Sequence, residues 1–190
     1  MMTQTSPPIS LAGQMLLAMP DMPDPRFARS VILMCVHDDG GALGIALDEP
    51  MAGIGLHTLL SSFDIQVGDV ADSIILAGGP VEPRRGFVLH SRDWVTKDSH
   101  LVAPDIALTG SLEVLGAIAS GEGPKEYLVA LGYAGWGSGQ LERELAAPGW
   151  YISAADPRKL FELAPEERWA CAFELEGIDP AMLANSSGYA

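Results

Sequence analysis

The chain has 190 residues, of which 48% are hydrophobic and 19% are charged, so it can bury a sizeable core and is not a disordered chain. Its 25 acidic residues outnumber the 11 basic ones and give a net charge of -14, which repels phosphate backbones and argues against direct DNA binding. No apolar stretch approaches the roughly 20 residues that span a bilayer, and the two cysteines make no disulfide framework. We therefore expect a cytoplasmic protein without a membrane segment.

The N-terminal half of the chain predicts a flexible tail at residues 1–9, followed by strands in a single domain that covers residues 10–190. Residues 30–36 are apolar at almost every position, as in a strand that is buried on both faces. The next segment, His37 to Gly41, predicts a hairpin, because glycine adopts positive φ without steric cost. The other elements expected in this half are strands at 13–19, 42–47, 73–77 and 86–90, weaker strands at 101–102 and 106–108, and a helix at 56–63.

The C-terminal half predicts helices that alternate with strands. A helix is expected at 111–120, capped by Ser111 and closed by Gly121. Residues 169–175 alternate like a strand, but the Pro165-Glu166-Glu167 start favours a helix, which we predict. The remaining expectations are a strand at 127–131, a glycine-rich loop at 132–140, a helix at 138–146, a strand at 150–153 and a helix that starts at 156. Strands that form hairpins and also interleave with helices imply an α+β fold with a mixed sheet.

The segment from Gly78 to Ser91 is the best candidate for a binding site. Gly78 and Gly79 can present backbone N–H groups, and the adjacent Arg84 and Arg85 can grip a carboxylate or a phosphate. The alternative is an ordinary connection between two strands with solvated arginines.

Arg26 and Arg29 form a second basic group, and their spacing of three places them on one face of any helical turn. They lie either in a local positive patch or on an ordinary solvated surface. The decisive structural question is whether Arg26, Arg29, Arg84 and His90 converge on one pocket. The full set of candidate ligand-binding residues is Arg26, Arg29, Gly78, Gly79, Glu82, Arg84 and His90. His90 is not expected to activate the adjacent Ser91, because neighbours on a strand point to opposite faces.

Motifs for a cofactor or a metal are missing from the sequence. The glycine-rich loop at 132–140 lacks the Gly-Lys-Ser/Thr of a P-loop and the third glycine of a dinucleotide fingerprint, so we expect a tight turn and no cofactor. The spacing of the histidines is not typical of metal ligands, and we expect no metal site; they are His37, His57, His90 and His100. Cys35 and Cys171 are either a redox-sensitive pair or two small buried hydrophobes.

Five motifs in a fixed order carry a resemblance to a known family. They are Gly13 to Pro20, Asp24 to Val31, Gly78-Gly79-Pro80-Val81, Gly86 to His90 and Leu131 to Gly137. With these motifs the chain, from about Leu11 to its C-terminus, resembles the YqgE/AlgH family of uncharacterised bacterial proteins. The resemblance implies a cytosolic single-domain protein with a twisted, mixed and largely antiparallel β-sheet flanked by α-helices. It implies no established activity, although the family carries a transcriptional-regulator label in some bacteria, tied to alginate production.

The sequence departs from the family pattern in two places. Asp48-Glu49-Pro50 stands where the family often has Asn-Arg-Pro, and Tyr189 stands where a histidine is common. The first departure weakens any anion site that relies on an arginine in that loop.

Three functions remain open from the sequence. We favour a non-catalytic regulatory or binding protein that acts through a protein partner or a small anionic ligand, because glycine loops and arginines occur without an assembled nucleophile, base or metal set. The second is a hydrolase-like small-molecule enzyme with its site at the Gly78–Ser91 loop. The third is a transcriptional regulator that acts on DNA, which the charge argues against.

Overall fold

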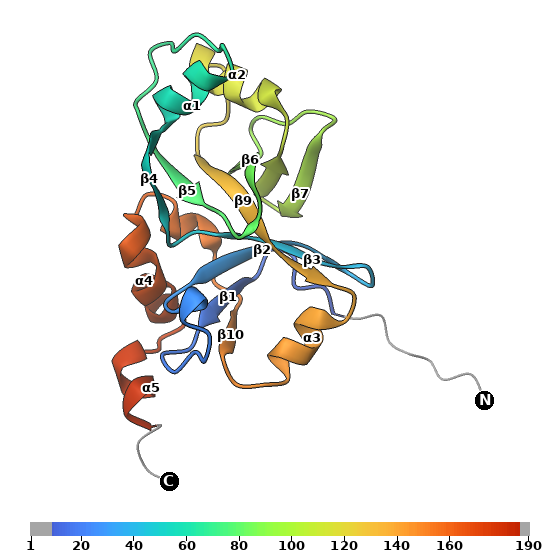
Figure 1. Ribbon diagram of the computed structural model, residues 1–190, viewed down its shortest axis with the longest axis vertical. Coiled ribbons are helices and arrows are strands. Elements are labelled where there is room, and N and C mark those ends of the chain that lie inside the picture. Colours follow the sequence, from blue (N-terminus) through green and yellow to red (C-terminus); the bar gives the residue numbers. More distant parts are fainter. Residues whose placement is uncertain (1–8, 187–190) are drawn as a thin grey trace, which may run out of the picture.

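One strongly twisted β-sheet forms the frame of the molecule (Figure 1). The computed structural model describes residues 9–186, so the tail predicted for residues 1–9 lies almost wholly outside the described part. Ten strands follow the order β10-β1-β2-β3-β9-β6-β8-β7, with β5 joined to β9 and β4 joined to β5. The pairing of β5 with β9 is parallel and the other pairings are antiparallel. The predicted α+β class and the mixed, largely antiparallel sheet are therefore confirmed.

The elements divide between two ends of the molecule. Figure 1 shows α1 and α2 together at one end, beside β4 to β7, whereas α3, α4 and α5 surround β1, β2 and β10. The strands are β1 (Met15–Ala18), β2 (Val31–Asp38), β3 (Gly41–Ala46), β4 (Pro50–Gly55), β5 (Ile74–Ala77), β6 (Val81–Ser91), β7 (Ser99–Ala103), β8 (Ile106–Thr109), β9 (Tyr127–Gly137) and β10 (Trp150–Ser153). The α-helices are α1 (Leu56–Ser62), α2 (Leu112–Ser120), α3 (Gln140–Leu145), α4 (Arg168–Leu175) and α5 (Pro180–Ser186). Three short 3-10 helices are η1 (Pro25–Phe27), η2 (Pro157–Leu160) and η3 (Pro165–Glu167).

Strand β9 connects the two halves of the sheet. Its first part pairs with β5 and β6, and its last part pairs with β3. The loop predicted at 132–140 is therefore wrong for residues 132–137, which continue the strand. Gly132 has a φ of 75°, and a Cβ on Gly132 would clash with the carbonyl oxygen of Gly79. The glycines here allow two backbones to pass in close contact, a role that residue type alone does not distinguish from a turn.

Helix α4 packs its apolar face on the core cluster that includes β1 and β2. Trp169, Ala172 and Phe173 are buried, whereas Cys171 and Leu175 are only partly buried. This spacing follows the 3.6-residue turn of a helix, so the helix predicted for this ambiguous segment is confirmed.

Several local predictions differ from the structure in detail. The hairpin predicted around Asp39 is confirmed, and Gly121 closes α2 with a φ of 78°. Ser111 occupies the N-cap position of α2, but its hydroxyl makes no capping hydrogen bond. Strand β4 and helix α5 were not predicted, and the helix expected from residue 156 is the 3-10 helix η2. Strand β4 contains glycines and a shift of register, so its sequence does not show the alternation of polar and apolar residues that identifies a strand.

No helix between residues 9 and 186 is both long enough and apolar enough to pass through a membrane.

Gly79 offers a test of the crossing between the two backbones. Gly79→Ala places a methyl group against the backbone of Tyr133 and Ala134 at a φ of 153°. We expect it to lower the free energy of unfolding by more than about 2 kcal/mol. The matched control is Gly116→Ala in α2, where nothing lies within 4 Å and where alanine should add about 0.5–1 kcal/mol. Urea unfolding measures both, and equal effects would contradict the crossing.

Candidate functional site

The segment between β1 and β2 is a loop with a defined shape. Asp24 starts η1, because its carboxylate accepts a hydrogen bond from the backbone N–H of Arg26 at 3.0 Å and Pro25 fits the first helical position. The Arg26 guanidinium pairs with the same carboxylate at 2.7 Å. The ring of Phe27 packs edge-on against Trp150 of β10, with ring centroids 5.7 Å apart. These contacts hold the loop against the sheet.

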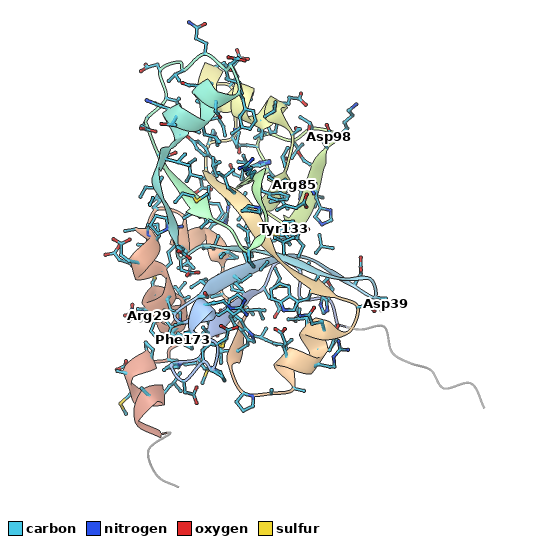
Figure 2. The ribbon with its side chains drawn as sticks, in the orientation of Figure 1. Arg29, Asp39, Arg85, Asp98, Tyr133 and Phe173 are labelled. Atoms are coloured by element: carbon cyan, nitrogen blue, oxygen red, sulfur yellow. The ribbon has the colours of Figure 1, made fainter. Side chains whose placement is uncertain are left out.

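Arg29 ends this loop in a conformation that L-residues rarely adopt. Its φ is 58°, in the left-handed region, which costs about 1–2 kcal/mol for a residue with a Cβ. Its guanidinium carbon lies 4.7 Å from the centroid of the Trp169 ring. Figure 2 shows the Arg29 side chain on the flank of the molecule beside α4. Across residues 9–186, no carboxylate lies within salt-bridge distance of Arg29, so its N–H groups are not committed to an ion pair.

Arg29 lines a cavity of about 660 Å³ between this loop, the turn after β3 and the start of α4. A second cavity of about 270 Å³ shares three of its lining residues and extends to Gly79 and Pro80 at the end of β5. The shared residues are Arg26, Asp48 and Glu49. Four segments that are far apart in the chain thus enclose one charged depression.

The start of α4 supplies the aromatic wall of the cavity. The indole N–H of Trp169 donates to the carbonyl oxygen of Ala18 at 2.8 Å, which fixes the ring under Arg29. The preceding residue, Arg168, is only 3% exposed. Its guanidinium donates to the carbonyl oxygens of Leu47, Leu160, Phe161 and Leu163. Burial lowers the pKa of Arg168 to about 10, so the group stays charged at neutral pH.

Asp48 is the half-buried acid of the cavity. Its Oδ1 accepts a hydrogen bond from the backbone N–H of Val31 at 2.8 Å. Burial raises the pKa of Asp48 to about 6, although this N–H favours the ionised form. A carboxyl group that titrates so close to neutral pH is common at functional sites. Glu49 and Glu166 are exposed and complete the acidic side of the cavity.

The structure brings together only part of the predicted ligand-binding set. Arg26 and Arg29 line the main cavity, and Gly79 lines the smaller cavity beside Arg26. Gly78 lies next to Gly79, but its N–H donates to the carbonyl oxygen of Leu131 at 2.8 Å and is not available to a ligand.

Glu82 and Arg84 lie outside both cavities. The Glu82 carboxylate pairs with Arg85 at 3.2 Å on an exposed surface, and Arg84 is also exposed. Figure 2 labels Arg85 close to Tyr133, on β6 and β9, away from Arg29.

His90 is fully buried in β6. Its Nδ1 lies 2.9 Å from the carbonyl oxygen of Ser91, which can only accept, so Nδ1 carries the proton. Its Nε2 then accepts a hydrogen bond from the Thr109 hydroxyl at 2.8 Å. Burial lowers the pKa of His90. Arg26, Arg29, Arg84 and His90 therefore do not converge on one pocket, because β6 directs its histidine into the core.

Both cysteines are free thiols. Cys35 is fully buried and its Sγ lies 3.5 Å from the carbonyl oxygen of Leu33, whereas Cys171 is partly buried. Burial raises the pKa of both thiols, which opposes formation of the reactive thiolate. In the described part of the chain, no group of three His, Cys, Asp or Glu residues could hold a metal ion.

The sequence did not single out the other residues of the cavity. Asp48 and Glu49 differed from the family pattern, and that difference was the only signal they offered. Trp169 and Glu166 offered none, because only the packing of η3 and α4 against the sheet brings them to the cavity that Arg29 lines.

The fold and the cavity define an α+β protein with a mixed sheet and a charged pocket built around an arginine. The chain belongs to the AlgH-like family, because the model of that family, DUF179, matches residues 15–181. The resemblance to the YqgE/AlgH family is thus confirmed.

Relatives of known sequence and structure match nearly the whole chain. A UPF0301 protein of Rhizorhabdus wittichii is 54% identical over 183 residues, which cover 96% of this chain and 98% of the relative. A UPF0301 protein of Cupriavidus metallidurans is 44% identical, with 100% of both chains covered. The solution structure of the AlgH protein from Pseudomonas aeruginosa has a TM-score of 0.77 at 39% identity, with 100% of both chains covered. A crystal structure from Corynebacterium diphtheriae, at 20% identity and a TM-score of 0.72 over 90% of each chain, shares the fold.

The left-handed backbone of Arg29 gives a stability test. Arg29→Gly and Arg29→Ala both remove the guanidinium, but only glycine removes the steric cost of the positive φ. We expect the glycine variant to be more stable than the alanine variant by about 1 kcal/mol in urea unfolding. At the neighbouring Ala28, with a φ of -55°, replacement by glycine should be destabilising. The same order at both positions would contradict a strained Arg29.

The raised pKa of Asp48 predicts how the stability of the protein depends on pH. Because its pKa is higher in the folded chain (about 6) than in the unfolded chain, the folded state holds more protons in that window, and stability should fall as the pH rises from about 4 to about 6. Asp48→Asn keeps an oxygen for the Val31 N–H and removes the charge. We expect it to gain on the order of 2 kcal/mol over wild type at about pH 7.5, and much less at about pH 4, in urea unfolding. A pH-independent difference would show that ionisation of Asp48 has no cost.

Proposed function

We propose that this protein is a non-catalytic binding protein, and that the cavity at Arg29 holds the anionic group of a small molecule. The observation that carries the proposal is the state of Arg29: a strained backbone, a guanidinium stacked on Trp169 and no ion-pair partner among the described residues. Strained residues persist where the surrounding structure holds them, and they cluster at ligand sites.

The stacked guanidinium is well suited to a carboxylate or phosphate oxygen pair. A planar guanidinium on an aromatic face keeps its edge free for two parallel hydrogen bonds. The nearby Arg26 is already paired with Asp24, so Arg29 is the cation that the cavity offers to a ligand. A cavity of about 660 Å³ also falls within the range of small-molecule sites.

A regulatory role rests on the same site. The loop that carries Arg29 is exposed, so a protein partner could recognise whether the cavity is occupied. Two free cysteines support a cytoplasmic location. The net charge of -14 counts against direct DNA contact.

A second candidate, a weak hydrolase, has one observation in its favour. The Ser30 side chain adjoins the Asp48 carboxyl, whose pKa is about 6, and both residues line the smaller cavity. We favour binding, because Asp48 also holds the Val31 N–H as a structural contact at the start of β2. Ester turnover that Ser30→Ala abolishes would reverse this preference.

The binding proposal is tested by titrating the protein with pentanoate, glutarate and inorganic phosphate. Binding should shift the NMR signal of the Trp169 indole N–H, because this ring contacts Arg29. Arg29→Ala should weaken that binding by about tenfold or more, since a charge-assisted hydrogen-bond pair is lost.

Arg84→Ala is the matched control, because Arg84 is exposed and lies outside both cavities. This substitution should leave the affinity unchanged. Equal losses in the two variants, or signal changes confined to other parts of the sheet, would rule out the Arg29 site.

A further inference from the structure

The charges around Arg29 do not suit a purely anionic ligand. Two cations, Arg26 and Arg29, line the main cavity together with three acids, Asp48, Glu49 and Glu166. Since Arg26 is paired with Asp24, one uncommitted cation faces these acids. A multiply charged anion such as phosphate would meet an excess of negative charge beside its one partner.

Two of these acidic side chains, Glu49 and Glu166, have no structural role that the fold explains. Glu49 and Glu166 are exposed, and neither side chain has an ion-pair partner within residues 9–186. The backbones of Glu49 and Glu166 are nevertheless held in position by neighbouring elements. The carbonyl of Glu49 accepts a hydrogen bond from the Ala77 N–H at 2.8 Å, and Glu166 belongs to η3, which runs directly into α4.

From this arrangement we infer that the ligand is amphoteric: its carboxylate binds Arg29, and an ammonium group on the same molecule binds Glu49 and Glu166. The chemical class is that of amino acids and other amine-bearing carboxylates. This inference rests on the proposed function, because it assigns a ligand class to the same cavity. It matches each charge of the ligand with an opposite charge of the wall, which neither an anion nor a cation alone achieves.

The acidic character of the whole chain supports this ligand class. A net charge of -14 lowers the local concentration of free anions, whereas a zwitterion has no net charge to repel. Discrimination then arises at the cavity, where a ligand without the amine leaves the acids Glu49 and Glu166 unmatched.

A matched series of small molecules tests the inference. Isothermal titration calorimetry compares 5-aminopentanoate with pentanoate, which lacks the amine, and with pentylamine, which lacks the carboxylate. Shorter and longer amino-carboxylates, from glycine to 6-aminohexanoate, find the spacing that fits best. We expect the best amino-carboxylate to bind about tenfold or more tightly than either the acid or the amine of the same chain length.

Substitutions of the charged residues show which of them bind the amine of the ligand and which bind its carboxylate. Glu49→Gln and Glu166→Gln should remove most of the advantage of the amine and leave the affinity for pentanoate unchanged or improved. Arg29→Ala should weaken both ligands. Glu162→Gln is the control, because this exposed acid precedes η3 and lies outside the main cavity.

The possible failures separate the two proposals. If pentanoate and its amine-bearing analogue bind equally and both depend on Arg29, the cavity is an anion site and the amphoteric ligand is wrong. If neither shows Arg29-dependent binding, the proposed function fails as well.

Discussion

The buried guanidinium of Arg168 ties the C-terminal part of the chain to the sheet, and the candidate site depends on this tie. It donates to the carbonyl of Leu47, directly after β3, and to the carbonyls of Leu160, Phe161 and Leu163 at the end of η2 and just beyond it. A buried charge that lost these acceptors would cost several kcal/mol, so α4 is held in one place relative to β3. Since Trp169 follows Arg168 and Asp48 follows Leu47, the same interaction sets two walls of the cavity.

The crossing of Gly78 and Gly79 with β9 sets a third wall. The close approach of the two backbones allows β5 to pair with β9 and leads the chain past Pro80 toward β6. The turn after β3 is held to the same point, because the Ala46 N–H donates to the carbonyl of Gly78 at 2.9 Å. The two halves of the sheet are therefore joined where the cavity lies.

On this rigid frame the loop that carries Arg29 is the strained component. The pairing of Arg26 with Asp24 and the packing of Phe27 on Trp150 hold the loop, so the cost of the left-handed Arg29 is met by contacts that do not involve a ligand. A guanidinium that is already oriented loses little conformational entropy when a ligand binds. The proposed site would therefore be preorganised, with its aromatic support already in position.

Local patterns in the sequence predicted many of the secondary-structure elements of this protein. Apolar runs predicted the buried strand at 30–36, glycine predicted the hairpin after it and the end of α2, and the acidic balance argued against DNA. Arg26 and Arg29, which the sequence indicated as candidates, both line the main cavity, because they belong to one short loop. Signals of this kind depend on only a few neighbouring residues, so they can be read without knowledge of the fold.

The tertiary structure decided what these residues do. It buried His90 beside Thr109, left Arg84 outside the cavities, and continued β9 through a segment whose glycines predicted a loop. It also placed Trp169 under Arg29 and raised the pKa of Asp48 to about 6. Burial, desolvation and stacking arise from contacts between segments far apart in the chain, and no local pattern encodes them.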